Sequence, residues 1–296
     1  MMEIATTDAS AKPLLYIILG TTGSGRREVL ADLIGGGLGT EARPVVLRSD
    51  NDGGEGIRWS LMAGGALAGG GGGGGEAVID AEVPAGSTHV FFLTDGRANP
   101  VDQLEAIKPW AAAAGLEVAR VITVVNCQLA ERHPALLAWY DACIHFSDIA
   151  LLHKREGVAN KWMSDFQGRY RDQFYPCLFE MVKQGRVHNP VLILEPEARR
   201  MSHVFDEDEW AGISLEGVEF GTEDDEGDDS DEAPGKRKNS KNKGKGQGKT
   251  KTAGGKNDTA EDDDDGMDLP EVDPYFERHN GGRRVKQIPD IAQFLE

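Results

Sequence analysis

Residues Leu14–Arg27 decide the fold, and they have the sequence LLYIILGTTGSGRR. Six residues typical of a buried strand lead into a glycine-rich turn and then into a helical pattern. The spacing of Gly20 and Gly25 matches the phosphate-binding loop G-x-x-x-x-G-K-[ST], which lies between a strand and a helix. Arg26 stands where that motif has lysine, and Arg27 stands where it has Ser or Thr. The sequence therefore predicts the scaffold of a nucleotide site without the hydroxyl group that holds magnesium.

Charge is concentrated in one segment of this 296-residue chain. The formal net charge is −18, and residues 206–273, with 23 acidic and 9 basic residues, contribute −14 of it. This acidity argues against general nucleic-acid binding, and the lysine-rich block Lys236–Lys256 contains no aromatic residue to stack on a base. We predict that residues 205–274 form a disordered linker. Residues 275–296 are then a short segment that docks on the domain or on a partner, and the charged tail is the expected contact with an unidentified protein partner.

The cysteines and the termini limit the class of protein. Cys127, Cys143 and Cys177 are far apart and odd in number, which fits neither a disulfide framework nor a CxxC metal site. No apolar run is long enough to span a membrane. Residues 1–12 lack the basic start and apolar core of a secretion signal, and we expect them to be flexible. These features predict a cytoplasmic protein with no membrane partner.

Short apolar runs alternate with helical patterns through the first two thirds of the chain. Runs that are apolar on both faces and separated by helices predict a mostly parallel sheet covered on both sides. The predicted fold class is α/β, a three-layer P-loop NTPase-like domain over residues 13–204, with a flexible glycine-rich loop at residues 51–76. The predicted elements are strands at Leu14–Leu19, Pro44–Arg48, His89–Thr94, Val118–Asn126 and Ile149–His153; helices at Arg26–Leu33, Val101–Ala114 and Pro134–His145; a long helical region at Val158–Gln184, either continuous or interrupted at Pro176; a last apolar run at Val191–Glu195; and one or two helical turns at Pro289–Leu295.

Two further turns follow predicted strands, at the edge where ligands bind in parallel sheets. Asp95, followed by Gly96, is a carboxylate in the position where nucleotide hydrolases hold magnesium through water. The alternative role of Asp95 is to cap the next helix. The residues His153–Glu156 compare with the N-K-x-D motif of GTP-specific proteins, in which Lys154 and Glu156 match the lysine and the acid. The alternative is a polar loop with no role in base recognition.

In this order and at these spacings, the motifs resemble those of the CobW-type GTPases, the metal-trafficking branch of the phosphate-loop GTPases. The resemblance covers about residues 14–195 and depends mainly on Thr94–Pro100, Val121–Val125 and Ser147–Lys154. It implies a GTPase domain that delivers or senses a metal such as zinc or cobalt.

The chain departs from this family at the positions that carry chemistry. The loop lysine and threonine of the family fall at Arg26 and Arg27, and its acidic residue before T-S-G falls at Leu93. Its metal-binding G-C-x-C-C motif belongs within Asp50–Asp80, where this chain has no cysteine. Thiolates are the ligands that such a soft or borderline cation needs, so we expect no bound zinc and no metal-binding residues.

We therefore predict a degenerate CobW-like protein, a GTP- or GDP-binding or regulatory module with weak or no hydrolysis and no need for magnesium. Two alternatives stay open: an active GTP hydrolase or metallochaperone with a rearranged loop, and a structural adaptor that presents the charged tail. No residue is assigned a catalytic role. The predicted nucleotide-binding residues are Gly20, Thr21, Thr22, Gly23, Ser24, Gly25, Arg26, Arg27, Asp95, Gly96, Lys154 and Glu156.

Overall fold

The computed structural model describes residues 12–62, 77–206 and 272–295. The expected flexible N-terminus, the glycine run Gly69–Gly75 and most of the expected linker lie outside these residues. The strands are β1 (Leu14–Leu19), β2 (Pro44–Ser49), β3 (Ile57–Met62), β4 (Val78–Asp80), β5 (His89–Leu93), β6 (Glu117–Asn126), β7 (Ile149–His153) and β8 (Leu178–Met181). The helices are α1 (Arg26–Gly37), α2 (Pro100–Ala113), α3 (Cys127–Arg132), α4 (Leu136–His145), α5 (Asn160–Arg171), α6 (Pro190–Leu194) and the 3-10 helix η1 (Ala292–Phe294).

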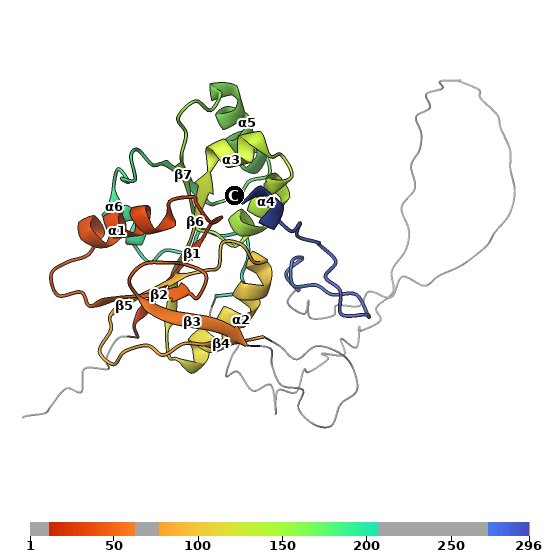
Figure 1. The fold of residues 1–296 in the computed structure, drawn as a ribbon. Helices are drawn as coiled ribbons and strands as arrows, with labels where there is room; N and C mark the ends of the chain where they lie inside the picture. The colour runs from red at the N-terminus through yellow and green to blue at the C-terminus, as the bar shows by residue number, and fades with distance from the viewer. Residues whose placement is uncertain (1–11, 63–76, 207–271, 296) are drawn as a thin grey trace, which may run out of the picture. The chain divides into compact units, whose positions relative to one another are not determined.

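The strands form one sheet in the order β4-β3-β2-β5-β1-β6-β7-β8. All neighbours are parallel except β3 and β4, and β1 lies between β5 and β6. Figure 1 shows α1 and α6 on one side of the sheet, with α2 and α4 on the other. The predicted α/β class, with a mostly parallel sheet between two helical layers, is confirmed.

Strand β1 is apolar at every position because it packs against a core on each face of the sheet. Leu15, Ile17 and Leu19 belong to the core beneath α2, α4 and α5, whereas Tyr16 and Ile18 belong to the core beneath α1 and α6. Each of the five side chains is at most 1% exposed. Successive side chains of a strand point to opposite faces, so a strand with helices on both sides needs apolar residues at every position.

The region Val158–Gln184 differs from its predicted helical character. Helix α5 ends at Arg171, and the chain then forms β8, which pairs with β7. Tyr175 N–H bonds to the Tyr170 carbonyl at 3.1 Å and closes the turn after the helix. The prediction was wrong because β8 is short and its pairing partner, β7, lies 25 or more residues earlier in the chain, so local periodicity did not reveal it.

Part of the expected flexible loop at residues 51–76 is also regular structure. Trp59 on β3 is 3% exposed, packs against Phe92 with ring centroids 4.6 Å apart, and donates from Nε1 to the Leu93 carbonyl at 2.8 Å. One large aromatic side chain supplies the buried surface that the glycine-rich composition suggested was missing.

The end of the domain contains helix α6, where only a last apolar run was predicted. Asn189 caps α6 by accepting from Leu192 N–H at 3.4 Å, and Pro190 occupies its first turn. Helix α1 continues past its predicted end to Gly37 and packs against α6. Gly37 permits this close approach, because a side chain there would meet Leu194 and the Pro190 backbone at 2.8–3.1 Å.

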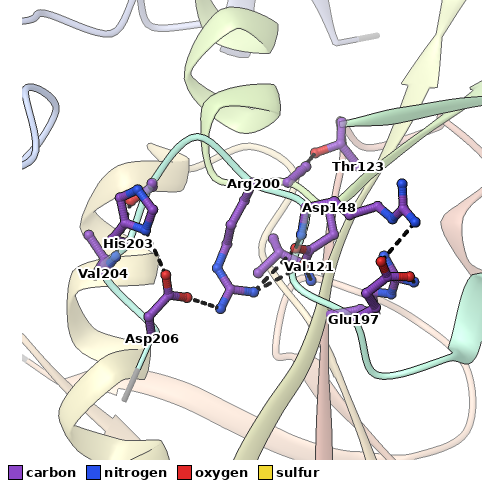
Figure 2. Close-up of polar contacts among 12 residues, drawn as sticks. Val121, Thr123, Asp148, Glu197, Arg200, His203, Val204 and Asp206 are labelled. Atoms are coloured by element: carbon purple, nitrogen blue, oxygen red, sulfur yellow. Dashed lines mark hydrogen bonds and ion pairs between the residues drawn. The ribbon is translucent and has the colours of Figure 1, made fainter. Parts of the chain in front are cut away.

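A buried carboxylate organises the opposite edge of the sheet from the glycine loop. Asp148 is fully buried just before β7 and accepts from Val121 N–H and Arg199 N–H, both at 2.6 Å. Arg200 is 7% exposed and lies 3.2 Å from one Asp148 oxygen and 2.6 Å from Asp206. Figure 2 shows Arg200 reaching between these two carboxylates. The segment after α6 is thereby fixed to the sheet.

The C-terminal residues 272–295 contact the same domain. Asp273 lies 2.9 Å from His145 Nε2 and accepts from the Ser202 hydroxyl at 2.5 Å. Arg284 lies 2.6 Å from Asp102 on α2, and the Phe294 ring centroid is 5.0 Å from that of His133. The predicted helical turns at Pro289–Leu295 are present as the single 3-10 turn η1. Among the residues described, no helix is long and apolar enough to cross a membrane.

Replacing Asp148 tests the buried network. We expect Asp148→Ala to lower the free energy of unfolding by about 3–5 kcal/mol, because it leaves the Arg200 guanidinium buried with less compensation. Urea denaturation measures the change. Asp165→Ala removes an exposed carboxylate that pairs with Lys161 and is the control, with no measurable change expected. Equal stability of the two variants would contradict the role of Asp148.

The contact between Asp273 and His145 predicts a dependence on pH. Burial raises the pKa of Asp273, but the hydrogen bonds from His145 and Ser202 outweigh it, and the pKa lies below its ordinary value. The carboxylate therefore stabilises the fold above the unfolded pKa of about 3.9 and loses this effect as the pH falls through the lower folded pKa.

Wild type should exceed Asp273→Asn in unfolding free energy by roughly 1.5–3 kcal/mol at pH 6. Urea titrations from pH 6 to pH 2 should show this difference vanish at the acid end. A difference that is constant across the range would contradict the assignment.

Candidate functional site

The glycine loop joins β1 to α1 at the carboxyl edge of the sheet. Gly20, Gly23 and Gly25 have φ values of 139°, 77° and 88°, which other residues rarely adopt. At Gly25 a side chain would collide with the His153 ring. A side chain on Gly20 would likewise meet the Val124 carbonyl at 2.6 Å. Both motif glycines are thus required by conformation and by close packing.

Groups at the ends of β6 and β7, and one on α4, hold this loop in place. The Tyr140 hydroxyl accepts from Asn126 N–H at 3.0 Å and shares a hydrogen bond with the Thr21 hydroxyl at 3.3 Å. His153 Nδ1 donates to the Ser24 carbonyl at 2.8 Å, so its proton is on that nitrogen. No sequence pattern indicates this role of Tyr140, which lies 119 residues after Thr21.

The buried atoms of the loop include one without a partner. Ser24 is fully buried, and its hydroxyl oxygen makes no hydrogen bond to any residue that the structure describes. Thr22 N–H donates to the Gly96 carbonyl at 3.1 Å, and Ser24 N–H donates to the Thr21 carbonyl at 3.1 Å. The amides of Thr22 and Ser24 therefore already donate to backbone carbonyls of this chain, whereas the Ser24 hydroxyl has no hydrogen-bond partner among the described residues.

Arg26 begins α1 and turns back across the loop. It is 5% exposed, donates from Nη1 to the Thr94 carbonyl, and forms an ion pair from Nη2 to Asp52 at 3.2 Å. Burial lowers the pKa of Arg26, while the nearby Asp52 and Asp95 act to raise it. The cation that replaces the motif lysine is thus present beside the loop, but it is held by Asp52. This partner was missed because Asp52 lies in the region expected to be a flexible loop.

Arg27 points to a different part of the chain. It is exposed and donates to the Gly53 carbonyl in the turn after β2. Its guanidinium has no free lone pair to offer a cation. The position where the motif has Ser or Thr therefore contributes no ligand for magnesium.

Asp95 and Gly96 lie directly beside the loop. Asp95 accepts from Asn51 Nδ2 at 2.7 Å and from Arg97 N–H at 2.9 Å. A side chain on Gly96 would meet the Arg26 guanidinium and the Gly20 carbonyl, each at 2.7 Å, as well as the Thr22 amide. The structure thus brings the segment after β5 into contact with the loop, and the Asp95 carboxylate already has two donors.

Lys154 and Glu156 follow β7, next to the loop contact made by His153. Lys154 is half-buried with a φ of 50°, and its carbonyl accepts from Gln128 N–H at 3.1 Å. Glu156 is exposed, and its carbonyl accepts from Gln128 Nε2 at 2.7 Å. Gln128 of α3 thus fixes the backbone of both residues. Gln128 was not among the residues predicted from the sequence. Neither side chain contacts the glycine loop through a hydrogen bond in the part of the chain described.

A cavity of about 290 Å³ lies at the ends of β2, β3 and β5, where its walls include Ser49, Asn51, Trp59 and Asp95. Within residues 12–62, 77–206 and 272–295, no group of three or more His, Cys, Asp or Glu side chains is placed to hold a metal ion.

No protein-family model and no curated protein matches the chain. The solved structures that align with it include the Zn(II)-bound YjiA GTPase from E. coli, at 10% identity and a TM-score of 0.37, and a Zn(II)-bound triple mutant of YjiA, at 11% identity and a TM-score of 0.39. Each alignment covers 64% of this chain and 67% of the other. These values are too low to assign a family or a function.

The contact between Gly96 and the loop gives a stability test. We expect Gly96→Ala to cost about 1–3 kcal/mol, because its methyl group would press on backbone atoms of Thr22 and Gly20. Gly35→Ala is the control: it lies within α1, meets no atom within 4 Å, and should stabilise by about 0.5–1 kcal/mol. Thermal unfolding of both variants measures the difference, and equal effects would contradict the close approach.

Proposed function

We propose that this chain is a GTP- or GDP-binding regulatory protein with a degenerate phosphate-loop GTPase domain, and that it hydrolyses nucleotide weakly or not at all. The observation that carries the proposal is the glycine loop over the start of α1 with the buried Arg26 guanidinium across it. Backbone amides and the positive end of a helix favour an anion there, and the unpartnered Ser24 hydroxyl supplies another donor.

Arg26 would be the residue that binds phosphate. A guanidinium presents a planar set of donors that matches phosphate oxygens. In the described structure two of its contacts are the Asp52 carboxylate and the Thr94 carbonyl. A phosphate group would therefore compete with Asp52 for the same cation, and this competition predicts weak binding.

The residues present do not fit magnesium. Arg27 replaces the hydroxyl ligand, and the Asp95 carboxylate accepts from Asn51 and Arg97. We therefore expect nucleotide binding without magnesium, and no hydrolytic step is assigned to any residue. Lys154 and Glu156 would border the base, which favours guanine over adenine.

Isothermal titration of the full chain with GDP, GTP and ATP, with magnesium or with EDTA, tests the proposal. Binding heat with GDP and GTP should be unchanged by EDTA. Arg26→Ala should weaken binding roughly tenfold, the effect of losing charge-assisted hydrogen bonds to phosphate. Arg43→Ala is the control, because Arg43 is exposed just before β2, at the opposite edge of the sheet.

Two further variants separate the competing interpretations. Asp52→Asn should tighten GDP binding several-fold, since it removes the charge that competes for Arg26. Arg26→Lys combined with Arg27→Thr should make binding depend on magnesium. No heat with any nucleotide in wild type or in Asp52→Asn would overturn the proposal. Turnover of GTP that Gly25→Val abolishes would show an active hydrolase instead.

A further inference from the structure

An exposed aromatic residue lies far from the glycine loop, after α5. Phe174 is 89% exposed and has a φ of 58°. For a bulky residue this left-handed conformation is strained, and the helix ending that it completes normally places glycine there. Glycine at this position would adopt the same backbone conformation without strain. The solvent-exposed ring therefore has no explanation in the packing of the domain.

Phe174 stands at the rim of a cavity of about 480 Å³, within the volume range of ligand pockets. Tyr175 and Phe179 give the cavity aromatic walls, and Arg171 and Gln167 of α5 add polar groups. The outer edge of β8 and four side chains beside it form one surface, which we call the β8 surface. The four side chains are those of Phe174, Tyr175, Phe179 and Arg171.

Strand β8 supplies unpaired backbone beside this cavity. It pairs with β7 on one side, and no described strand pairs with its other side. Leu178 N–H and Val182 N–H bond to the Asp148 and Leu152 carbonyls on the β7 side. Because backbone groups alternate along a strand, the amides of Phe179 and Met181 point outward. An exposed edge of this kind is a template for another strand.

The charges beside the β8 surface are mainly basic. Arg171 is exposed at the cavity, and Lys183 and Arg186 are exposed just past the end of β8. Asp172 pairs with Arg171 at 3.5 Å in an exposed contact, and Glu180 shares the opposite face of the strand with Leu178. Carboxylates placed toward Arg171 and Lys183 would therefore increase the affinity of a partner strand for this surface.

We propose that the β8 surface binds an extended, acidic peptide segment of a partner protein, which adds as a strand to the edge of β8 and inserts an aromatic or large aliphatic side chain into the cavity. Backbone hydrogen bonds give such complexes affinity, and the pockets for alternate side chains give specificity. A small apolar ligand would fill the cavity but leave the strand edge unpaired.

Phage-displayed eight-residue peptides selected on the full-length protein identify the probe. The selected peptides should alternate large apolar residues with other residues and should carry Asp or Glu. A labelled synthetic peptide of the consensus is then titrated by fluorescence anisotropy. Methylation of its backbone nitrogens at alternate positions should abolish binding in one register and leave it intact in the other.

Phe174→Gly is the decisive variant, because it relieves the strained backbone as it removes the ring. Its melting temperature should stay equal or rise, while affinity for the peptide falls at least tenfold. Gln184→Gly relieves a similar strain at φ 51° outside the cavity lining and should leave binding unchanged. Arg171→Gln should weaken binding several-fold and reduce its dependence on salt.

Three results would overturn the proposal. The first is a selection that yields no peptide of this pattern, and the second is peptide binding that Phe174→Gly leaves intact. The third is a dimer in sedimentation equilibrium that Phe174→Gly dissociates, because the occupant of the β8 surface would then be a second copy of this chain.

Discussion

The rest of the structure depends on the hydrogen bonds that the fully buried carboxylate of Asp148 accepts. The carboxylate accepts hydrogen bonds from two backbone amides and from the Arg200 guanidinium, while the Asp148 backbone carbonyl accepts from Leu178 N–H. One residue thereby joins β6, β7, β8 and the segment after α6. Burying a charge costs much free energy unless the charge is paired and hydrogen-bonded, so this network fixes how these four elements meet. Ser202, two residues after Arg200, donates a hydrogen bond to Asp273 of the C-terminal segment.

With one edge of the sheet fixed in this way, the opposite edge carries the candidate site. The turns that follow β1, β5 and β7 meet there through contacts such as Thr22 with Gly96 and His153 with Ser24. What distinguishes this site is that its cation is already paired within the chain: Asp52 holds Arg26. Under the proposed function, an anion that binds to this loop would take the buried Arg26 guanidinium from Asp52, and the binding strength would depend on Asp52 as much as on the glycine loop.

The errors of the sequence-based predictions have a common cause. Strand β8 and helix α6 were missed because each is only four or five residues long, too short for periodicity to distinguish helix from strand. Strand β3 was missed because glycine-rich neighbours suggested a flexible loop, whereas the single side chain of Trp59 buries enough surface to order it. In each case the stabilising contact comes from residues far away in the chain: β7 for β8, α1 for α6, and Phe92 for Trp59.

The sequence by itself determined the α/β class, the central strand with its glycine loop and helix, and the edge of the sheet at which the candidate residues gather. These features follow from local patterns: apolar runs, glycines at fixed spacing, and turns at the ends of strands. Only the tertiary structure decided which groups those residues contact. The pairing of Arg26 with Asp52, the support of Thr21 by Tyr140, and the exposure of Phe174 beside an open strand edge all depend on long-range packing or on chain direction. Local periodicity carries no information about such contacts, because they depend on which distant residues the folded sheet brings together.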